Sequence, residues 1–372
     1  MERVMRVLGF MSGTSLDGID MAVVETDGVS VSAFGPAGEG ALPEETRALV
    51  LDAIAAGRRW GRGEPEPNLF GHVAEAVTRA HFDAAEVFLA KHGLGWGDID
   101  LIGFHGQTVA HEAPTPERPG RTRQLGDGEA LARLTGVPVA FDFRTVDVEA
   151  GGQGAPLVPI YHAALVQASG LKPPVAVLNL GGVGNLTLIG ADGSLRAFDT
   201  GPGNGLIDAW VEANGAGRYD TDARLALAGR VHEGVVAAMM DHPFFGLDGP
   251  KSLDRYDFTP APVRGLSLQD GAATLAAFTA AAVAWGLKRA GFAAPCLIVC
   301  GGGRRNPAIL RELGLRARTP VMVAEAVGWR GDSIEAEAFA YLAARTAAGL
   351  QITFPGTTGA ASAMTGGRLA RP

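Results

Sequence analysis

The sequence predicts an α/β protein of two similar domains with a shared cleft, and three observations support this prediction. The 372 residues exceed what one hydrophobic core usually holds. Hydrophobic residues make up 47% and charged residues 19%, as in a well-packed globular chain. An apolar strand, a glycine-rich turn and a second strand open the chain, and the same pattern returns at residues 175–189. We expect both turns to point into the cleft, where ligands usually bind.

The overall charge argues against two classes of partner. With 32 basic and 40 acidic residues, the net charge is −8. The sequence therefore lacks the excess of basic residues that binding to nucleic acid or to an anionic membrane surface requires. The sequence contains neither about 18 uninterrupted apolar residues nor a signal-peptide pattern. Cys296 and Cys300 have the spacing of neither a metal site nor a disulfide framework. We therefore expect a cytoplasmic protein that binds no nucleic acid and no membrane.

The first half of the sequence contains short apolar runs, which are typical of strands, and segments whose apolar residues recur at helical spacing. The patterns predict strands at about 6–11, 20–26 and 29–34, helices at about 43–57 and 67–93, a buried strand within 101–108 and a strand at 138–142. The pattern at 101–108 is that of a buried strand ending in a polar turn, and α/β sheets place their sites at such strand ends.

The second half begins after a segment rich in glycine and proline at 149–159, where we place the crossing between domains. The elements expected after it are strands within 175–189, a strand at 196–199, a helix from Gly205, a long apolar helix at 272–290, a strand at 297–300 and a helix at 333–347. We predict a first domain at 1–145, a second at 146–349, and a return of 350–372 to the first.

Three glycine-rich turns, at 13–18, 181–185 and 301–306, each follow an apolar strand. Phosphate oxygens need close backbone approach, which a Cβ obstructs, so this arrangement favours nucleotide binding. Each turn alone is equally well explained as an ordinary tight turn. No G-x-x-x-x-G-K-[ST] loop is present, so lysine is not an obvious phosphate ligand. Lys251 remains a candidate, with a solvated loop lysine as the simpler interpretation.

Asp199 is the strongest candidate for a catalytic carboxylate. It ends an apolar strand beside the rigid Gly-Pro-Gly turn at 201–203, and this geometry suits a general base. The alternative is a turn-capping aspartate. Asp17 and Asp20 are rival bases or magnesium ligands, and hairpin chemistry is their alternative explanation.

Further polar residues follow other predicted strands. His105 and Gln107 could bind sugar hydroxyls or an amide, although His105 could equally be a buried core histidine. Arg144 could hold a carboxylate or phosphate, or could pair internally with Asp142. Glu335 lies in the first turn of a predicted helix, where it could contact substrate or simply cap the helix. No histidine spacing indicates a metal site, and G-x-S-x-G is absent.

Seven motifs, taken in order, resemble the anhydro-N-acetylmuramic acid kinase family. They are MSGTSLDG at 11–18, FHGQT at 104–108, DFR at 142–144, GGQGAPLVP at 151–159, NLGG at 179–182, FDTGPGN at 198–204 and CGGG at 300–303. Each motif is short, but their joint order extends over nearly the whole chain and is specific.

The resemblance implies membership of the sugar kinase, actin and heat-shock ATPase superfamily. It implies two RNase H-like domains that flank a nucleotide and substrate cleft and close on ATP and Mg²⁺. The implied reaction converts 1,6-anhydro-N-acetylmuramic acid, ATP and water to N-acetylmuramic acid 6-phosphate and ADP in cell-wall recycling, and a homodimer is also implied. The alternatives are a kinase of the same fold for another sugar or a carboxylate, and an actin-like ATPase that is not a kinase.

The resemblance also implies residue roles. Asp199 takes a proton from the water that attacks the anomeric carbon, and Arg144 is the candidate partner of the lactyl carboxylate. The implied ATP contacts are Gly13, Thr14, Ser15, Leu16, Asp17, Gly18, Ile19, Asp20, Gly181, Gly182, Gly301, Gly302 and Gly303. The implied substrate contacts are His105, Gln107, Arg144, Gly154, Asn204 and Glu335. Asp17 and Asp20 are the expected magnesium ligands.

Overall fold

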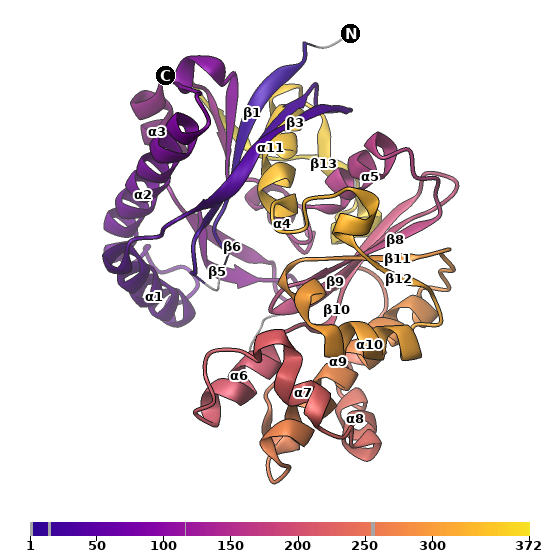
Figure 1. The fold of residues 1–372 in the computed structure, drawn as a ribbon. Coiled ribbons are helices and arrows are strands. Elements are labelled where there is room, and N and C mark those ends of the chain that lie inside the picture. Colours follow the sequence, from indigo (N-terminus) through magenta and orange to yellow (C-terminus); the bar gives the residue numbers. More distant parts are fainter. Residues whose placement is uncertain (1–2, 14–15, 116, 254–256) are drawn as a thin grey trace. The chain divides into compact units, whose positions relative to one another are not determined.

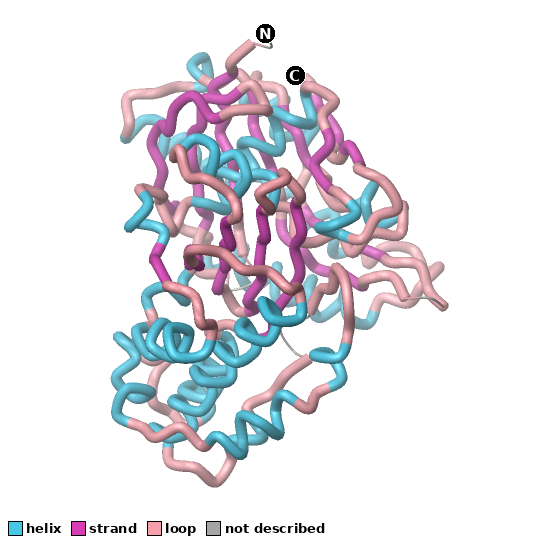
Figure 2. Tube along the Cα trace, turned by 90° about the vertical axis from the view of Figure 1, so that its right-hand side faces the viewer, coloured by secondary structure: helices cyan, strands magenta, loops and turns pink. Residues whose placement is uncertain are grey.

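The computed structural model divides the chain into two compact units (Figure 1). Unit 1 comprises Met1–Ala168 and Ser333–Pro372, and unit 2 comprises Ser169–Asp332. The structure describes residues 3–13, 16–115, 117–253 and 257–372. Each unit combines a sheet with helices. Figure 2 shows the helices and strands along the chain, and the predicted α/β class is confirmed.

Unit 1 is built on a six-stranded sheet with the order β15-β7-β4-β1-β2-β3. Its strands are β1 (Met5–Met11), β2 (Ile19–Thr26), β3 (Val31–Gly40), β4 (Leu101–Phe104), β7 (Val139–Phe141) and β15 (Arg368–Ala370). β1, β2 and β3 form an antiparallel meander, whereas β1, β4 and β7 run parallel. The segments that follow β1, β4 and β7 therefore emerge at the same edge of the sheet.

Unit 2 repeats this arrangement in a five-stranded sheet with the order β10-β9-β8-β11-β12. Its strands are β8 (Val175–Leu180), β9 (Val183–Ile189), β10 (Leu195–Pro202), β11 (Leu297–Cys300) and β12 (Val321–Val323). β8, β9 and β10 are again an antiparallel meander, and β8, β11 and β12 are parallel. The shared order and directions are those of an RNase H-like sheet, and they confirm the predicted repeat.

The side chains of β1 point alternately to the two faces of the sheet, and this explains the layers of unit 1. Leu8 and Phe10 point into the core formed with α1 (Glu44–Arg59) and α2 (Leu69–Lys91). Val7 points to the opposite face, against α11 (Ile334–Ala347), which lies beside β1 in Figure 1. Successive side chains of a strand face opposite sides, so one apolar run serves both layers.

Two glycines allow α11 to lie directly on the sheet. Gly9 and Gly103 are register partners on β1 and β4. A Cβ on Gly9 would lie 2.0 Å from the carbonyl oxygen of Ala336, and one on Gly103 would lie 2.1 Å from that of Phe339. Only glycine permits this approach between helix backbone and strand.

Unit 2 is centred on α9 (Leu268–Arg289). Ser267 caps this helix by accepting a hydrogen bond from the N–H of Asp270 at 3.0 Å. Within the part of the chain that the structure describes, α9 is the one helix long and apolar enough by composition to cross a membrane, and 78% of its most apolar window is buried. Leu275, Phe278 and Val283 are fully or almost fully buried in the core of unit 2, which accounts for the composition of the helix.

The remaining elements are shorter. In unit 1 they are η1 (Trp96–Asp98), β5 (Gln107–Glu112), β6 (Arg121–Leu125), α3 (Gly128–Thr135), α4 (Thr145–Glu149), α5 (Pro159–Ala168), β13 (Gln351–Thr353), α12 (Pro355–Thr358) and β14 (Met364–Thr365). In unit 2 they are α6 (Gly205–Ala213), η2 (Thr221–Ala223), α7 (Arg224–Ala228), α8 (Glu233–Met240), η3 (Pro243–Gly246), η4 (Ala261–Val263), η5 (Gly302–Arg305), α10 (Pro307–Arg316) and η6 (Ala324–Val327).

The units divide the chain at different residues from the two predicted domains. The sequence placed the divisions after 145 and 349, whereas the units divide after Ala168 and Asp332. Unit 1 consequently includes α4, α5 and α11. The second boundary lies before α11 and not after it, because α11 packs on Gly9 and Gly103 of the unit 1 sheet. The segment 350–372 belongs to unit 1 together with α11.

Candidate active site

In unit 1, the turn after β1 contacts the segment after β4. Gln107 donates a hydrogen bond from Nε2 to the carbonyl oxygen of Gly13 at 3.4 Å. Leu16 and Ile19 are buried in the core of unit 1, so only their backbones are available to a nucleotide. Thr14 and Ser15 lie outside the described residues, and their roles as ATP contacts remain predictions.

His105 is held in one neutral tautomer. Its Nδ1 lies 2.7 Å from the carbonyl oxygen of Gly106, which can only accept, so Nδ1 carries the proton. Nε2 is then the acceptor for Nε of Arg144 at 3.1 Å. Burial lowers the pKa of His105 well below its usual value, and the nearby Arg144 cation lowers this pKa further. The histidine is therefore a neutral acceptor that orients an arginine.

Arg144 also contacts the glycine-rich segment at 151–159. Its Nη1 donates to the carbonyl oxygen of Gly154 at 2.7 Å. The N–H of Gly154 donates to Oδ2 of Asp147 at 2.8 Å, and Thr358 Oγ1 donates to Oδ1 of the same carboxylate at 2.7 Å. These two acceptors of Arg144, a ring nitrogen and a carbonyl oxygen, are both uncharged. The structure thus brings together three predicted substrate contacts: His105, Arg144 and Gly154.

Asp147 is a site residue that the sequence analysis missed. Its side chain is buried and joins Gly154 to α12. The available signal was its position three residues after Arg144 and just before a glycine-rich segment, since residues i and i+3 of a helical turn share a face. Its contact with Thr358, 211 residues away, has no local signature.

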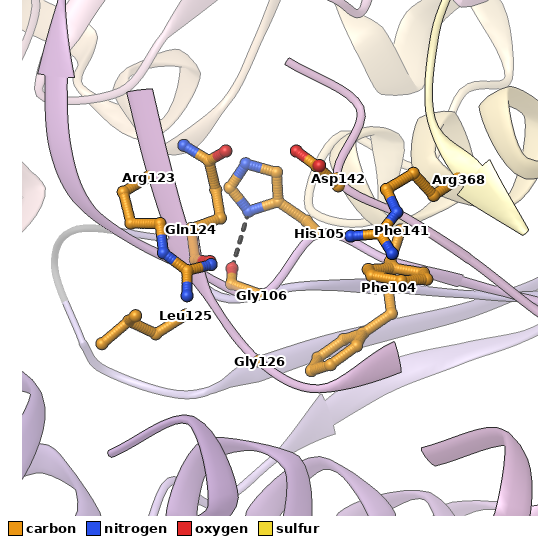
Figure 3. A pocket seen from close by; sticks show the side chains of 10 residues that line it. All are labelled: Phe104, His105, Gly106, Arg123, Gln124, Leu125, Gly126, Phe141, Asp142 and Arg368. Atoms are coloured by element: carbon orange, nitrogen blue, oxygen red, sulfur yellow. Dashed lines mark hydrogen bonds between the residues drawn. The ribbon is translucent and has the colours of Figure 1, made fainter. Parts of the chain in front are cut away.

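A small cavity of about 50 Å³ lies beside His105. It is lined by Phe104, His105, Gly106, Arg123, Gln124, Leu125, Gly126, Phe141, Asp142 and Arg368 (Figure 3). Asp142 adopts a positive φ of 57° and accepts a hydrogen bond from Thr145, and Arg368 lies over the ring of Phe141. This volume holds roughly a few waters and is too small for a sugar.

Glu335 lies one turn of α11 before a residue that contacts His105. The rings of Phe339 and His105 have centroids 4.7 Å apart. Residues i and i+4 share a helix face, so Glu335 is on the face of α11 that includes this contact. Its placement is compatible with the predicted substrate role, which remains a prediction.

In unit 2, three turns that follow strands pack into one cluster. The N–H of Gly203 donates to Gly182 O at 2.9 Å, and the N–H of Asn204 donates to Gly181 O at 2.8 Å. Gly301 has a φ of +72°, and a Cβ there would lie 2.4 Å from Asn179 Oδ1. The predicted ATP contacts of this unit and Asn204 are therefore brought together in one cluster of glycine-rich turns.

Asp199 lies in β10 at a bulge and is 8% exposed. Its Oδ2 accepts a hydrogen bond from the N–H of Leu253 at 2.7 Å, and its own N–H donates to Lys251 O at 2.9 Å. A segment more than fifty residues later in the chain thus lies along the carboxylate. This hydrogen bond orients one carboxylate oxygen, as a general base requires.

Lys251 is not the solvated loop lysine that its sequence context suggested. Its Nζ donates to the carbonyl oxygens of Phe244 and Leu247 and lies 4.2 Å from the ring centroid of Phe244. Burial lowers the pKa of this amine. Lys251 holds the segment that lies along Asp199, because both carbonyl acceptors belong to the preceding turn.

The described residues form no cluster of several side chains that could bind Mg²⁺ without a substrate. Within the described ranges, no group of three or more His, Cys, Asp and Glu side chains is placed to hold a metal ion. Mg²⁺ in phosphoryl-transfer sites is commonly bound by one or two carboxylates, with water and substrate phosphates as its other ligands. Asp17 and Asp20 fit that smaller requirement by chemistry.

Comparison with known proteins gives one family. The family model described as anhydro-N-acetylmuramic acid kinase matches residues 5–371. The chain is 64% identical over 365 residues to the protein of that name from Caulobacter vibrioides, covering 98% of each chain. It is 59% identical over 368 residues to the one from Phenylobacterium zucineum, covering 99% of this chain and 100% of that one.

The solved structures with a similar fold are remote. One is the (R)-2-hydroxyglutaryl-CoA dehydratase component A from Acidaminococcus fermentans, with a TM-score of 0.47 and 12% identity, covering 92% of this chain and 99% of that one.

Proposed function

The chain belongs to the anhydro-N-acetylmuramic acid kinase family, and we propose that it uses ATP and water to convert 1,6-anhydro-N-acetylmuramic acid to N-acetylmuramic acid 6-phosphate and ADP. Hydrolytic ring opening and phosphorylation are then one coupled event in the recycling of cell-wall sugar. The observation that carries the residue assignment is the oriented Asp199 carboxylate beside the cluster of glycine turns in unit 2.

Asp199 acts as the general base. It takes a proton from water while the water oxygen forms a bond to the anomeric carbon, and the bond from that carbon to O6 breaks. O6 then attacks the γ-phosphorus of ATP, and ADP departs. The water oxygen remains in the product as the anomeric hydroxyl. The Leu253 N–H supports this role because it holds Oδ2 and so fixes the direction of the carboxylate.

ATP phosphates are bound mainly through backbone N–H groups. The proposed contacts are the turn at 13–20, with Gly13, Asp17 and Gly18, and the glycines at 181–182 and 301–303. Phosphoryl transfer depends largely on positioning and charge stabilisation, which fixed N–H groups supply. Asp17 and Asp20 would hold Mg²⁺ together with ATP, and the ion would supply positive charge to offset the charge of the phosphates.

The sugar is recognised chiefly through its lactyl carboxylate. Arg144 is its proposed partner, because two uncharged acceptors already orient the guanidinium. Gly154 belongs to the same cluster, and His105 fixes the arginine. Gln107, Asn204 and Glu335 are the further proposed sugar contacts. A guanidinium fork distinguishes a carboxylate from a neutral substituent.

The test is turnover with isotope-labelled water. Purified protein is incubated with ATP and the anhydro sugar in H₂¹⁸O, and the products are measured by mass spectrometry. We expect ADP and a 6-phosphosugar that carries one ¹⁸O at the anomeric carbon. Because the anomeric hydroxyl of a reducing sugar exchanges with water, samples are taken at early times beside a control of unlabelled product in the same water.

Two results would favour the alternatives. Phosphorylation of reducing N-acetylmuramic acid but not of the anhydro sugar would indicate a kinase of the same fold with another acceptor. ADP release that does not require any sugar would indicate an actin-like ATPase.

The remaining features of the proposal concern the protein as a whole. We propose a cytoplasmic enzyme that forms a homodimer, by resemblance to the family. Light scattering of the purified chain measures its mass in solution, and a monomeric mass at micromolar concentration would contradict the dimer.

A further inference from the structure

Arg304 directly follows the glycine turn at 301–303 and is almost completely buried. Its side chain is 5% exposed. Nη1 donates to the carbonyl oxygen of Gly301 at 3.1 Å, which closes the turn, and to Oδ1 of Asp332 at 2.8 Å. Nε donates to Oε1 of Glu325 at 2.8 Å. One guanidinium thus joins the turn to two segments that come later in the chain.

Both carboxylates are ionised partners of this arginine. Hydrogen bonding to Arg304 is the main cause that lowers the pKa of Glu325 and that of Asp332. Charge-assisted hydrogen bonds to a planar guanidinium are strong and directional. Gly331 leaves room for the side chain, because a Cβ there would lie 2.2 Å from Nε of Arg304.

The partner segments are the end of unit 2. Glu325 lies in η6, and Asp332 is the last residue of the unit. The first residue of the unit is fastened to the same region, since Trp329 Nε1 donates to Oγ of Ser169 at 2.7 Å. The glycine turn is therefore tied to the place where the chain enters and leaves unit 2.

Three consecutive glycines cannot hold a shape by themselves. Glycine loses more conformational freedom on ordering than any other residue, and residues 301–303 have no side chains with which to anchor the turn. Leu180 limits the turn on one side, because a Cβ on Gly303 would lie 2.5 Å from Leu180 Cβ. The backbone N–H of Arg304 donates to the carbonyl oxygen of Gly301 at 3.2 Å, and the Arg304 side chain adds a second anchor on the same oxygen.

We propose that Arg304 is a positioning residue for nucleotide binding: it holds the turn at 301–303 in the conformation that receives a nucleoside triphosphate. This inference rests on the proposed function, in which that turn contacts ATP. Arg304 itself acts through Gly301, Glu325 and Asp332. Removal of its fork leaves the glycines present and lets the turn move, so nucleotide affinity falls without any change in the sugar contacts.

The experiment measures ADP binding by titration calorimetry, which is independent of sugar turnover. Arg304→Met retains the length of the stem and removes all the donors. We expect the Kd for ADP to rise by about tenfold or more, since small misplacement of binding groups has effects of this size. The lysine of Arg304→Lys can pair with one carboxylate but cannot bridge Gly301, Glu325 and Asp332. We therefore expect this variant to have a Kd for ADP that is intermediate between those of the wild type and Arg304→Met.

Arg316→Met is the matched control. Arg316 is also a partly buried arginine of unit 2 with two acidic partners, Glu233 and Glu312, but it lies at the end of α10. We expect it to lower the thermal midpoint with ADP affinity unchanged. A split of kinetic constants adds a second measurement: Arg304→Met raises KM for ATP and leaves KM for the sugar within about twofold.

The carboxylate partners complete the test. Asp332→Asn keeps the shape and removes the charge, so it weakens ADP binding in the wild type and has a smaller effect in the Arg304→Met background. A folded Arg304→Met protein with the ADP affinity of the wild type would overturn the proposal, as would a wild-type protein that binds no ADP. If the wild type binds ADP with this dependence on Arg304 but does not phosphorylate the sugar, the positioning role stands and the proposed function fails.

Discussion

Nε of Arg144 donates a hydrogen bond to Nε2 of His105 at 3.1 Å, between residues 39 positions apart in the chain. This bond exists only while Nε2 has a free lone pair. A protonated His105 would place a second cation against Arg144 and would lose the acceptor. The orientation of Arg144, a proposed substrate contact, therefore depends on His105 being neutral.

We predict that Arg144 sets the preference for a lactyl carboxylate. Arg144→Met is expected to raise KM for the anhydromuramic sugar by about 10- to 100-fold, because a charge-assisted hydrogen-bond pair is lost. The corresponding anhydro sugar without a lactyl group is used as a second acceptor, and its KM is expected to change little. Arg79→Met on α2, which removes an exposed pair with Asp83, serves as the control. Equal effects on both acceptors would contradict the carboxylate assignment.

We predict that Asp199→Asn abolishes turnover while nucleotide still binds. General-base catalysis contributes about 10²- to 10⁴-fold, so kcat is expected to fall by at least that amount. The amide still accepts the hydrogen bond from Leu253, which preserves the local fold. Asp192→Asn, in an exposed turn of unit 2 where Ser194 is the partner, is the control and should retain activity. Wild-type kcat in Asp199→Asn would rule out this base.

We predict that the folded protein loses stability as the pH falls below about 6.5. Burial lowers the pKa of His81 to about 4 and that of His162 to about 3. Between pH 6.5 and these values the unfolded chain binds more protons than the folded chain, so the free energy of unfolding decreases as pH decreases. Each histidine contributes roughly 1.4 kcal/mol per pH unit where it is charged only in the unfolded state. Chemical denaturation at pH 7.5, 6.0 and 5.0 measures this loss.

The variant His81→Phe isolates the contribution of one histidine. The ring of His81 lies among Phe10 and Phe104, with centroid distances of 5.4 and 5.0 Å, so phenylalanine suits the surroundings. We expect a shallower pH dependence than in the wild type. An unchanged dependence would show that His81 is not the buried neutral group described here.

We predict that Gly9→Ala is destabilising by about 1–3 kcal/mol or more, as for overpacked cores, because the added Cβ would meet the backbone of α11 at Ala336. Gly71→Ala in α2 is the matched control, since a Cβ there has nothing within 4 Å. Alanine is the better helix former by about 1 kcal/mol, so the control is expected to be stabilising. Thermal and urea unfolding measure both variants. Equal stability of Gly9→Ala and the wild type would show that α11 is not held against β1.

Much of the active-site proposal was readable from local sequence. The glycine turns after three apolar strands, the polar residues that follow two others, and Asp199 beside Gly-Pro-Gly are short-range patterns. Their grouping into one family depended on their order along the chain. The position of Asn204 against Gly181 and of Arg144 against His105 then followed from the sheet, which sets strand ends side by side.

By itself, the sequence determined the α/β class, the repeated strand-turn-strand units and the main candidate residues, because strand and helix periodicity and glycine-rich turns are local properties. Only the tertiary structure decided which distant groups meet. Asp147 reaches Thr358 across 211 residues, Leu253 reaches Asp199 across 54, and Arg304 joins Gly301 to Asp332. The place of α11 in unit 1 also depends on a contact between distant segments. Gly9 and Gly103 together leave room for the backbone of α11 only when β1 and β4 pair.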